Sequence, residues 1–462
     1  MLKDLAILCI VCSLSCSSIL FSQSADQDKI YVTEVSGLQR KANILVFTCH
    51  FGSGHMMASQ GILERLSDCN VQVVDVYGEP LSSLDLLWAI SSKKWRSEDI
   101  FNQLMKKEQN QLLNWMSKLR FTALQKQKIE LLLSEYISKS SPDMVISCIS
   151  MINSMLLDVA NQLNLPFLVI TTDIDISDFC YGFLNHDQLV GKDRFRISVP
   201  FSKTTWGPEY SNHLPKCVKS SLQYSFAYPT RFAFSQTFDE STLNRLREEY
   251  QIQQDENVIL VMMGGNTSQA PLYYAKLLLG MSENEIREIV GSDPQRTKIR
   301  LICLCGDLSQ KMNRTLMLQL DALNQSVKLN KSVTIHACPG TPHIAQLVSL
   351  PEMKAVISKP GGSTVNEMIK KKMPMVYHVS TVPLEWEKGN LTYGVSRGLG
   401  KAFQLEKEID DKVRTSFVKT LAFLFVLHTE IQEGRKIVPE ASFDFTINLR
   451  SAVREMLSSS HY

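Results

Sequence analysis

A turn of two glycines near residue 360 separates an apolar, strand-like run from a helical pattern. The segment reads SKPGGSTVNEM from 358 to 368, and Gly361 and Gly362 form the turn. Glycine allows backbone N–H groups to come close to a phosphate, and the dipole at a helix N-terminus favours an anion. We therefore expect Ser363 and Thr364 to begin a helix that binds phosphate.

Glu367 lies about one turn further into this expected helix. A carboxylate there would repel the phosphate, yet it could accept two hydrogen bonds from a ribose diol. Thr364 and Glu367 also have the spacing of a capping box, in which the carboxylate satisfies the backbone N–H of the capping residue. The spacing alone favours the cap and leaves ribose binding as the alternative.

His55 follows a second glycine-rich turn, CHFGSGHMMAS, at the start of another helical pattern. Transfer to a hydroxyl needs a base with a pKa near neutral, and an imidazole supplies one. A protonated His55 could instead stabilise departing phosphates, and a purely structural His55 would cap its helix or bond the loop. Asp173, at the end of the run PFLVITTD, is the second acid–base candidate, although aspartate at such a turn is more often a helix N-cap.

A third glycine-rich turn, MGGNTSQ, follows another apolar run in the second half of the chain. Ligands of parallel α/β sheets bind at the carboxyl ends of the strands, which is where such turns lie. One turn alone is weak evidence. One turn from the first half and two from the second indicate a ligand cleft between two domains.

Length and composition agree with this organisation. The chain has 462 residues, which is too many for one ordinary core, and it is 44% hydrophobic and 21% charged. A formal net charge of +2 gives no global reason to expect a nucleic-acid partner. Outside the N-terminal apolar run, the cysteines show no C-x-x-C pair that would hold zinc and no dense disulfide framework, which favours a reducing compartment.

Short apolar runs alternate with helical patterns from residue 42 onward, which is typical of an α/β fold with parallel sheets. The segment YSFAYPTRFAF, 224–234, contains a proline and no clear periodicity, so we place the domain boundary there. Two helical patterns, about 406–433 and 443–457, end the chain, and one of them could cross back to the first domain. The expected strands fall at 42–48, 71–77, 143–148, 166–173, 257–265, 298–306, 332–337, 354–359 and 373–379.

An apolar run near the N-terminus, LAILCIVCSLSCSSILF at 5–21, is long enough for a signal sequence or a marginal membrane anchor. The box SLSC, which ends at Cys16, is an imperfect lipoprotein cleavage site. A retained anchor or peripheral membrane contact is the first interpretation, export is the second, and a buried core segment is the third. We expect a membrane-associated protein with its active site on the cytoplasmic side.

A basic and aromatic segment runs from Lys93 to Lys128, with nine Lys or Arg residues against three Asp or Glu. Such a segment can lie on an anionic bilayer, with lysines reaching headgroups and aromatic rings entering the interface. The alternative is a solvated pair of helices whose aromatic rings pack into the core. The candidate membrane or acceptor residues are Gly54, Lys93, Lys94, Trp95, Lys106, Lys107 and Trp115.

In combination, these segments resemble the monogalactosyldiacylglycerol synthase family, which belongs with the bacterial lipid II N-acetylglucosaminyltransferase to glycosyltransferase family 28. SKPGGSTVNEM and the later VPLEWEKGN are similar to the family's K-P-G-G-S/T-T-x-x-E and G-Q-E-x-G-N motifs. FGSGHMMAS resembles its G-G-G-H-x-A-S loop, and YPTRFAF its inter-domain P-V-R-x-x-F. The resemblance spans roughly 42–400.

The resemblance implies a GT-B architecture, in which two Rossmann-like domains with parallel sheets face a cleft. After the N-terminal segment at 1–23, an acceptor domain would span 42–228 and a nucleotide-sugar domain 229–430, with a helical segment at 431–462. The implied reaction is inverting transfer with neither a metal nor a cofactor, because the uridine diphosphate (UDP) sugar is the donor substrate.

By motif position, Glu367 would bind the ribose of UDP, and Glu387 and Asn390 would contact the donor sugar. The match also favours a catalytic role for His55. Two departures from the family pattern, at GGNTS and EWE, put the phosphate contacts and the identity of the sugar in doubt. The other nucleotide-sugar residues that the resemblance implies are Gly264, Gly265, Pro360, Gly361, Gly362, Ser363 and Thr364.

These observations predict an enzyme that moves a hexose from a UDP-sugar to a lipid hydroxyl, with diacylglycerol as the expected acceptor. Two alternatives remain open at this point. One is a nucleotide-sugar epimerase of GT-B fold, which would react without lipid. The other is a catalytically inactive protein that binds a sugar nucleotide or a lipid.

Overall fold

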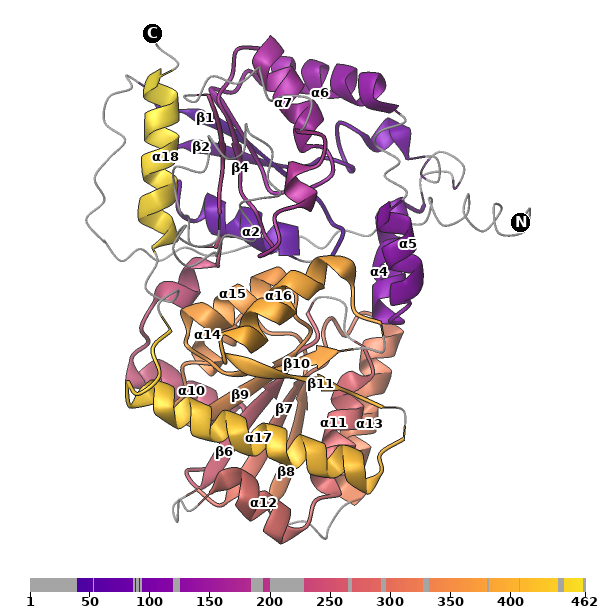
Figure 1. The fold of residues 1–462 in the computed structure, drawn as a ribbon, viewed down its shortest axis with the longest axis vertical. Helices are drawn as coiled ribbons and strands as arrows, with labels where there is room; N and C mark the ends of the chain where they lie inside the picture. The colour runs from indigo at the N-terminus through magenta and orange to yellow at the C-terminus, as the bar shows by residue number, and fades with distance from the viewer. Residues whose placement is uncertain are drawn as a thin grey trace.

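A computed structural model shows two α/β domains stacked end to end (Figure 1). The N-terminal apolar segment, Lys93, Gly265 and Asn266 lie outside the described residues. The residues that the structure describes are 40–52, 54–85, 88, 91, 94–118, 125–183, 194–199, 228–264, 268–291, 296–326, 332–379, 382–406, 408–438 and 444–459.

The N-terminal domain is built on a five-stranded sheet with the strand order β2-β1-β3-β4-β5. Every neighbouring pair of its strands is parallel. The central strands β1 and β3 are largely apolar and buried because helices cover the sheet, whereas the edge strand β2 is more polar and more exposed. Their bounds are β1 Asn43–Thr48, β2 Asn70–Asp75, β3 Met144–Ser147, β4 Phe167–Val169 and β5 Phe195–Ile197.

The helices of this domain have two different roles. Some of them cover the sheet, whereas α4 and α5 form a hairpin that extends to the C-terminal domain (Figure 1). The helix bounds are α2 Gly54–Leu63, α4 Ser97–Lys106, α5 Asn110–Lys118, α6 Lys126–Ser140 and α7 Asn153–Gln162, with short 3₁₀ helices at Ser82–Leu84 and Asp178–Cys180.

The C-terminal domain has a six-stranded sheet with the strand order β11-β10-β9-β6-β7-β8, and its neighbouring strands are again parallel. A short 3₁₀ helix at Phe232–Ser235 precedes it. The strands are β6 Glu256–Val261, β7 Lys298–Leu304, β8 Val333–Cys338, β9 Met353–Ser358, β10 Met375–Val379 and β11 Gly400–Gln404.

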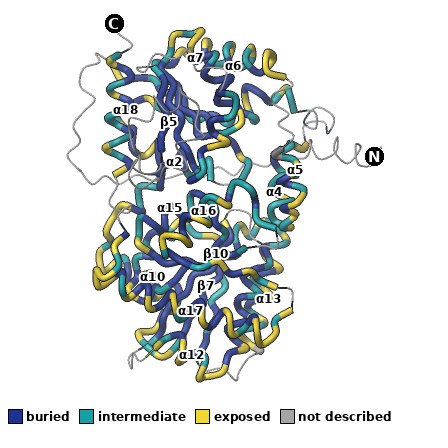
Figure 2. The backbone as a smooth tube through the Cα atoms, in the orientation of Figure 1, coloured by how far each residue is buried: buried dark blue, intermediate teal, exposed yellow. Residues whose placement is uncertain are grey.

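Helices cover this second sheet as well, and α17 packs against β9, β10 and β11. Figure 2 shows the central strands of both domains as mostly buried and the outer helices with exposed residues. The two-domain α/β fold that the sequence predicted is confirmed. The helices are α10 Glu240–Glu249, α11 Ala270–Leu279, α12 Glu283–Val290, α13 Lys311–Ser326, α14 Ile344–Leu347, α15 Gly362–Lys370, α16 Glu385–Ser396 and α17 Asp411–Gln432.

The last helix, α18 at Phe445–Ser459, packs on the N-terminal domain (Figure 1). It shares one apolar cluster with strands β1, β3 and β4 and with helix α2. Polar contacts add to this packing, because Arg196 pairs with Glu455 and Arg65 donates a hydrogen bond to Thr446. The chain therefore passes between the domains a second time after α17.

Within the described part of the chain, none of the helices is both long enough and apolar enough to span a bilayer.

Candidate active site between the two domains

His55 is the second residue of α2, at the boundary between the domains. Its Nδ1 lies 2.7 Å from the backbone oxygen of Cys148. A carbonyl oxygen only accepts, so Nδ1 carries the proton and Nε2 is left with a free lone pair. Burial lowers the pKa of His55 below its ordinary value of 6.5, although the bond to Cys148 opposes this shift. The ring is therefore neutral near pH 7 and can accept a proton at Nε2.

Asp173 follows β4 and faces the other domain. Its Oδ1 accepts a hydrogen bond of 2.9 Å from Nδ2 of Asn390, and its Oδ2 accepts one of 3.3 Å from the hydroxyl of Thr172. Burial raises the pKa of Asp173 to about 6. The 3₁₀ helix that follows begins at Asp178, so Asp173 is not its N-cap. The carboxyl group instead belongs to the contact between the domains.

The N-termini of α2 and α15 meet at this boundary (Figure 1). The hydroxyl of Ser363 donates to the backbone oxygen of Gly54 over 3.1 Å. Both helices point the positive end of their dipole at the junction, an arrangement that favours an anion there. Gly362 is required for the close approach, since a Cβ at this position would lie 1.9 Å from the oxygen of Thr172.

Glu367 is buried on α15 and pairs with Arg231. Nε and one terminal nitrogen of Arg231 donate to the two carboxylate oxygens over 2.7 and 2.8 Å. The capping-box interpretation is wrong, because the N-cap of α15 is Gly361 and no side chain caps this helix. Thr364 is thus the third helical residue, and Glu367 lies too far into the helix to reach the N-cap amide.

Glu387 and Asn390 project from one face of α16. Asn390 bridges the domains, because its Oδ1 accepts from the backbone N–H of Ile174 and its Nδ2 donates to Asp173 and to the oxygen of Pro360. Burial raises the pKa of Glu387 to about 7. Its Oε1 lies near Gly361, since a Cβ on that glycine would be 3.9 Å away.

The structure thus gathers His55, Asp173, the start of α15, Glu387 and Asn390 at one place. Among the described residues, the lysines that were predicted to contact the membrane or the acceptor lie elsewhere. Lys94 and Lys107 are exposed, and Lys106 donates 2.7 Å to Gln310 of the C-terminal domain.

The remaining predicted residues are also spread out. Trp95 and Trp115 are 41% and 46% exposed, and Gly264 is exposed after β6. Lys93 and Gly265 cannot be placed, because they lie outside the described residues.

Sequence reasoning assigned no role to two residues of the site. Arg231 belongs to the YPTRFAF motif, and its positive charge is the sequence signal for a carboxylate partner. Cys148 acts through its backbone oxygen, for which no side-chain pattern exists. In the described ranges, no group of three or more His, Cys, Asp or Glu side chains is arranged to hold a metal ion.

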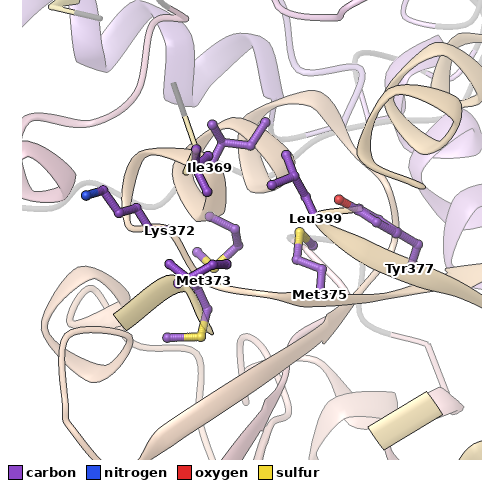
Figure 3. Close-up of a pocket in the computed structure, with 9 residues that line it drawn as sticks. Ile369, Lys372, Met373, Met375, Tyr377 and Leu399 are labelled. Atoms are coloured by element: carbon purple, nitrogen blue, oxygen red, sulfur yellow. The ribbon is translucent and has the colours of Figure 1, made fainter. Parts of the chain in front are cut away.

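An apolar pocket between α15 and α17 lies apart from this site (Figure 3). None of the predicted site residues lines it. Its lining residues are Met368, Ile369, Lys372, Met373, Met375, Tyr377, Leu399, Ile431 and Val438.

The overall architecture matches known glycosyltransferase structures. MurG from Acinetobacter baumannii has a TM-score of 0.51 at 11% identity, and the match covers 90% of this chain and 99% of MurG. UGT89C1 of Arabidopsis thaliana, solved with UDP-L-rhamnose, has a TM-score of 0.51 at 12% identity, with 91% and 100% coverage. At such identities the likeness shows the GT-B fold alone.

Sequence relatives add to the likeness in fold. The processive diacylglycerol β-glucosyltransferase of Bacillus licheniformis is 23% identical over 377 residues, which are 80% of this chain and 85% of the relative. The protein of the same description from Staphylococcus epidermidis is 23% identical over 383 residues, with 80% and 83% coverage. The chain is a glycosyltransferase of the GT-B type.

No family model matches the chain. The sequence relatives support the resemblance of this glycosyltransferase to family 28, and the solved structures support its fold. The two sheets and the junction of α2 with α15 are the parts of the GT-B fold that position its candidate site.

Proposed function

We propose that this glycosyltransferase moves a hexose from a UDP-sugar to the hydroxyl of diacylglycerol or a similar lipid, with inversion. The observation that carries the proposal is the hydrogen bond from His55 Nδ1 to Cys148, because it leaves Nε2 as a base next to two helix N-termini. The relatives named diacylglycerol β-glucosyltransferases support the lipid acceptor.

In the proposed reaction, Nε2 of His55 takes the proton of the lipid hydroxyl. The oxygen then forms a bond to the anomeric carbon, while the bond from that carbon to the phosphate oxygen breaks and its electron pair stays on UDP. Attack opposite to the leaving group inverts the configuration. The first-turn N–H groups of α15 would stabilise the charge that develops on the diphosphate.

Donor binding requires the two domains to separate at first. The Ser363–Gly54 and Asn390–Asp173 hydrogen bonds close the junction, and Gly362 packs against Thr172. The donor would enter when these contacts open, and the domains would close again around it. Glu367 can still serve the ribose, because a carboxylate that accepts two bonds from an arginine retains further lone pairs.

The α4–α5 hairpin and the residues directly before it support a place at a membrane surface. Trp95 and Trp115 are partly exposed, and Lys94 and Lys107 are exposed. Aromatic rings and lysines of this kind suit the interface of an anionic bilayer. We drop Lys106 from this group, since it is bonded to Gln310. We propose that the site works on the cytoplasmic side, where nucleotide sugars are made.

The test is to incubate the purified protein with a panel of UDP-sugars and vesicles that contain diacylglycerol. A new glycolipid should be detected by mass, and its anomeric configuration should be opposite to that of the donor. His55→Ala should reduce turnover by about 10²- to 10⁴-fold, while UDP affinity stays unchanged. No glycolipid with any donor, or full activity of His55→Ala, would contradict the proposal.

A further inference from the structure

The hairpin of α4 and α5, residues 97–118, holds the segment that leads to His55. Glu98 and Asn102 lie one turn apart on α4. The backbone N–H of His50 donates 2.8 Å to Glu98, and that of Gly52 donates 3.0 Å to Oδ1 of Asn102. Nδ2 of Asn102 donates 2.9 Å to the oxygen of His50. Three hydrogen bonds thus fix the backbone directly before α2.

The other end of the hairpin holds the segment that leads to α16. Asn110 and Asn114 lie one turn apart on α5 and are 7% exposed. Asn110 donates 2.7 Å to the oxygen of Val382, and Asn114 donates 2.9 Å to that of Pro383. The backbone N–H of Glu385 donates 3.0 Å to Asn114. At both ends of the hairpin, asparagine side chains therefore form hydrogen bonds with the backbone of a segment that leads to the site.

Further contacts attach the hairpin to the C-terminal domain. The ring of Phe101 stacks on Trp386 with 5.8 Å between centroids. Glu108, at the turn between the helices, lies 3.6 Å from Nε2 of His378, and Lys359 reaches the oxygen of Met105. Trp386 stands where the resembling family has glutamine, so this stack accounts for that departure in the EWE segment.

From these contacts we infer that the hairpin sets the position of His55 relative to α16, with Asn102 and Asn114 as positioning residues for the transfer step. The inference rests on the proposed function for the reaction itself. Asn102 is bonded to the acceptor-side loop, and Asn114 is bonded to the donor-side helix. The hairpin links the two, so domain closure brings the base and the sugar contacts into one fixed arrangement.

Hydrogen exchange tests this link without any activity. Asn114→Ala removes a contact in the C-terminal domain, yet it should raise exchange at the amides of His50 and Gly52 by about tenfold, the equivalent of one ordinary hydrogen bond. Gln111→Ala, at an exposed position of the same helix, is the matched control and should leave these amides unchanged. Unchanged exchange in Asn114→Ala would overturn the inference.

A second variant covers the case in which Asn114→Ala fails to fold. Trp386→Gln removes the stack with Phe101 from the C-terminal side and should raise exchange at the same amides. Exchange that stays at the wild-type level in this variant would also overturn the inference.

Transfer kinetics test the positioning role. Asn102→Ala and Asn114→Ala should each lower kcat by about 10- to 100-fold, because a small misplacement of reacting groups slows the chemical step, whereas UDP affinity should stay within about twofold. The double variant should be about as slow as the slower single variant, since both changes break one linkage. Multiplied losses in the double variant would show two independent structural effects and would overturn the inference.

The two readouts separate the possible failures. If the wild type makes no glycolipid, the proposed function fails, and the exchange at His50 and Gly52 still decides whether the hairpin links the domains. If transfer is real and exchange does not respond, only the linkage fails.

Discussion

Replacing Glu387 with glutamine should stabilise the protein at high pH while it slows transfer. Glu387 is 7% exposed, and burial raises its pKa from 4.5 to about 7, with repulsion from Asp173 and Glu108 in the same direction and Lys359 opposing it. The folded state therefore binds the proton more tightly than the unfolded state. The contribution of this proton to the unfolding free energy is fully present below pH 4.5 and is lost as the pH rises through about 7.

The difference between these two pKa values corresponds to about 3 kcal/mol of unfolding free energy at pH 8. Glutamine has nearly the same shape and no charge to bury, so Glu387→Gln should be more stable than the wild type by about this amount at pH 8. At pH 5 the gain should be below about 1 kcal/mol. Urea titrations at the two pH values measure both differences.

Glu385→Gln is the matched control for this measurement. Glu385 lies two residues earlier on α16, and its side chain is 40% exposed and paired with Lys388. An exposed pair contributes at most about 1 kcal/mol, so the control should shift stability little at either pH. A gain for Glu387→Gln that is equal at pH 5 and pH 8, or a loss at pH 8, would refute the reasoning. In the transfer assay, Glu387→Gln should lower kcat/KM by about 10- to 100-fold through a lost charged contact with the sugar.

Three further outcomes follow from contacts of the site and the hairpin. If His55 is the base, transfer should fall as the pH drops through the pKa of His55, which burial lowers below its ordinary value of 6.5, because the protonated ring cannot accept a proton; activity that instead falls as the pH rises would indicate the protonated form. Glu367→Gln should reduce the unfolding free energy by about 3 kcal/mol, since Arg231 would lose its buried counter-ion, and an unchanged melting temperature would contradict this role. Exchanging both Lys94 and Lys107 for glutamine should weaken binding to phosphatidylserine vesicles by about 1 kcal/mol per charge, and binding that ignores both the variant and added salt would argue against membrane contact.

The fold was predictable because its signals are local. Apolar runs of strand length alternate with helical patterns, and glycines mark the turns that follow several strands. The start of α15 illustrates this, because Gly362 makes a close backbone approach that no larger residue allows: a Cβ there would lie 1.9 Å from the oxygen of Thr172. The rule that ligands bind at the carboxyl ends of parallel strands places the starts of α2 and α15 at the binding edge of their own sheets. That the two edges face each other was implied only by the resemblance to the family.

Contacts made across long sequence distances were not predictable in the same way. The spacing of Thr364 and Glu367 fits a capping box, but the helix begins earlier than expected and Arg231, from 136 residues away, takes the carboxylate. The basic and aromatic pattern of the hairpin predicted either a segment on a bilayer or a solvated helical pair whose aromatic rings pack into the core. Sequence patterns do not say what an aromatic ring will pack against, and here Phe101 stacks on Trp386 of the C-terminal domain.

The return of α18 to the N-terminal domain has a consequence for how the two halves can move. In the part of the chain that the structure describes, the polypeptide passes between the domains before α10 and again after α17, and α18 is held by its apolar cluster and by Arg196 and Arg65. Two connections between rigid domains define a hinge axis. We expect the domains to open by a hinge rotation about this axis, and the second connection should suppress sliding and twisting of one domain relative to the other. Each turnover would then use the same opening motion.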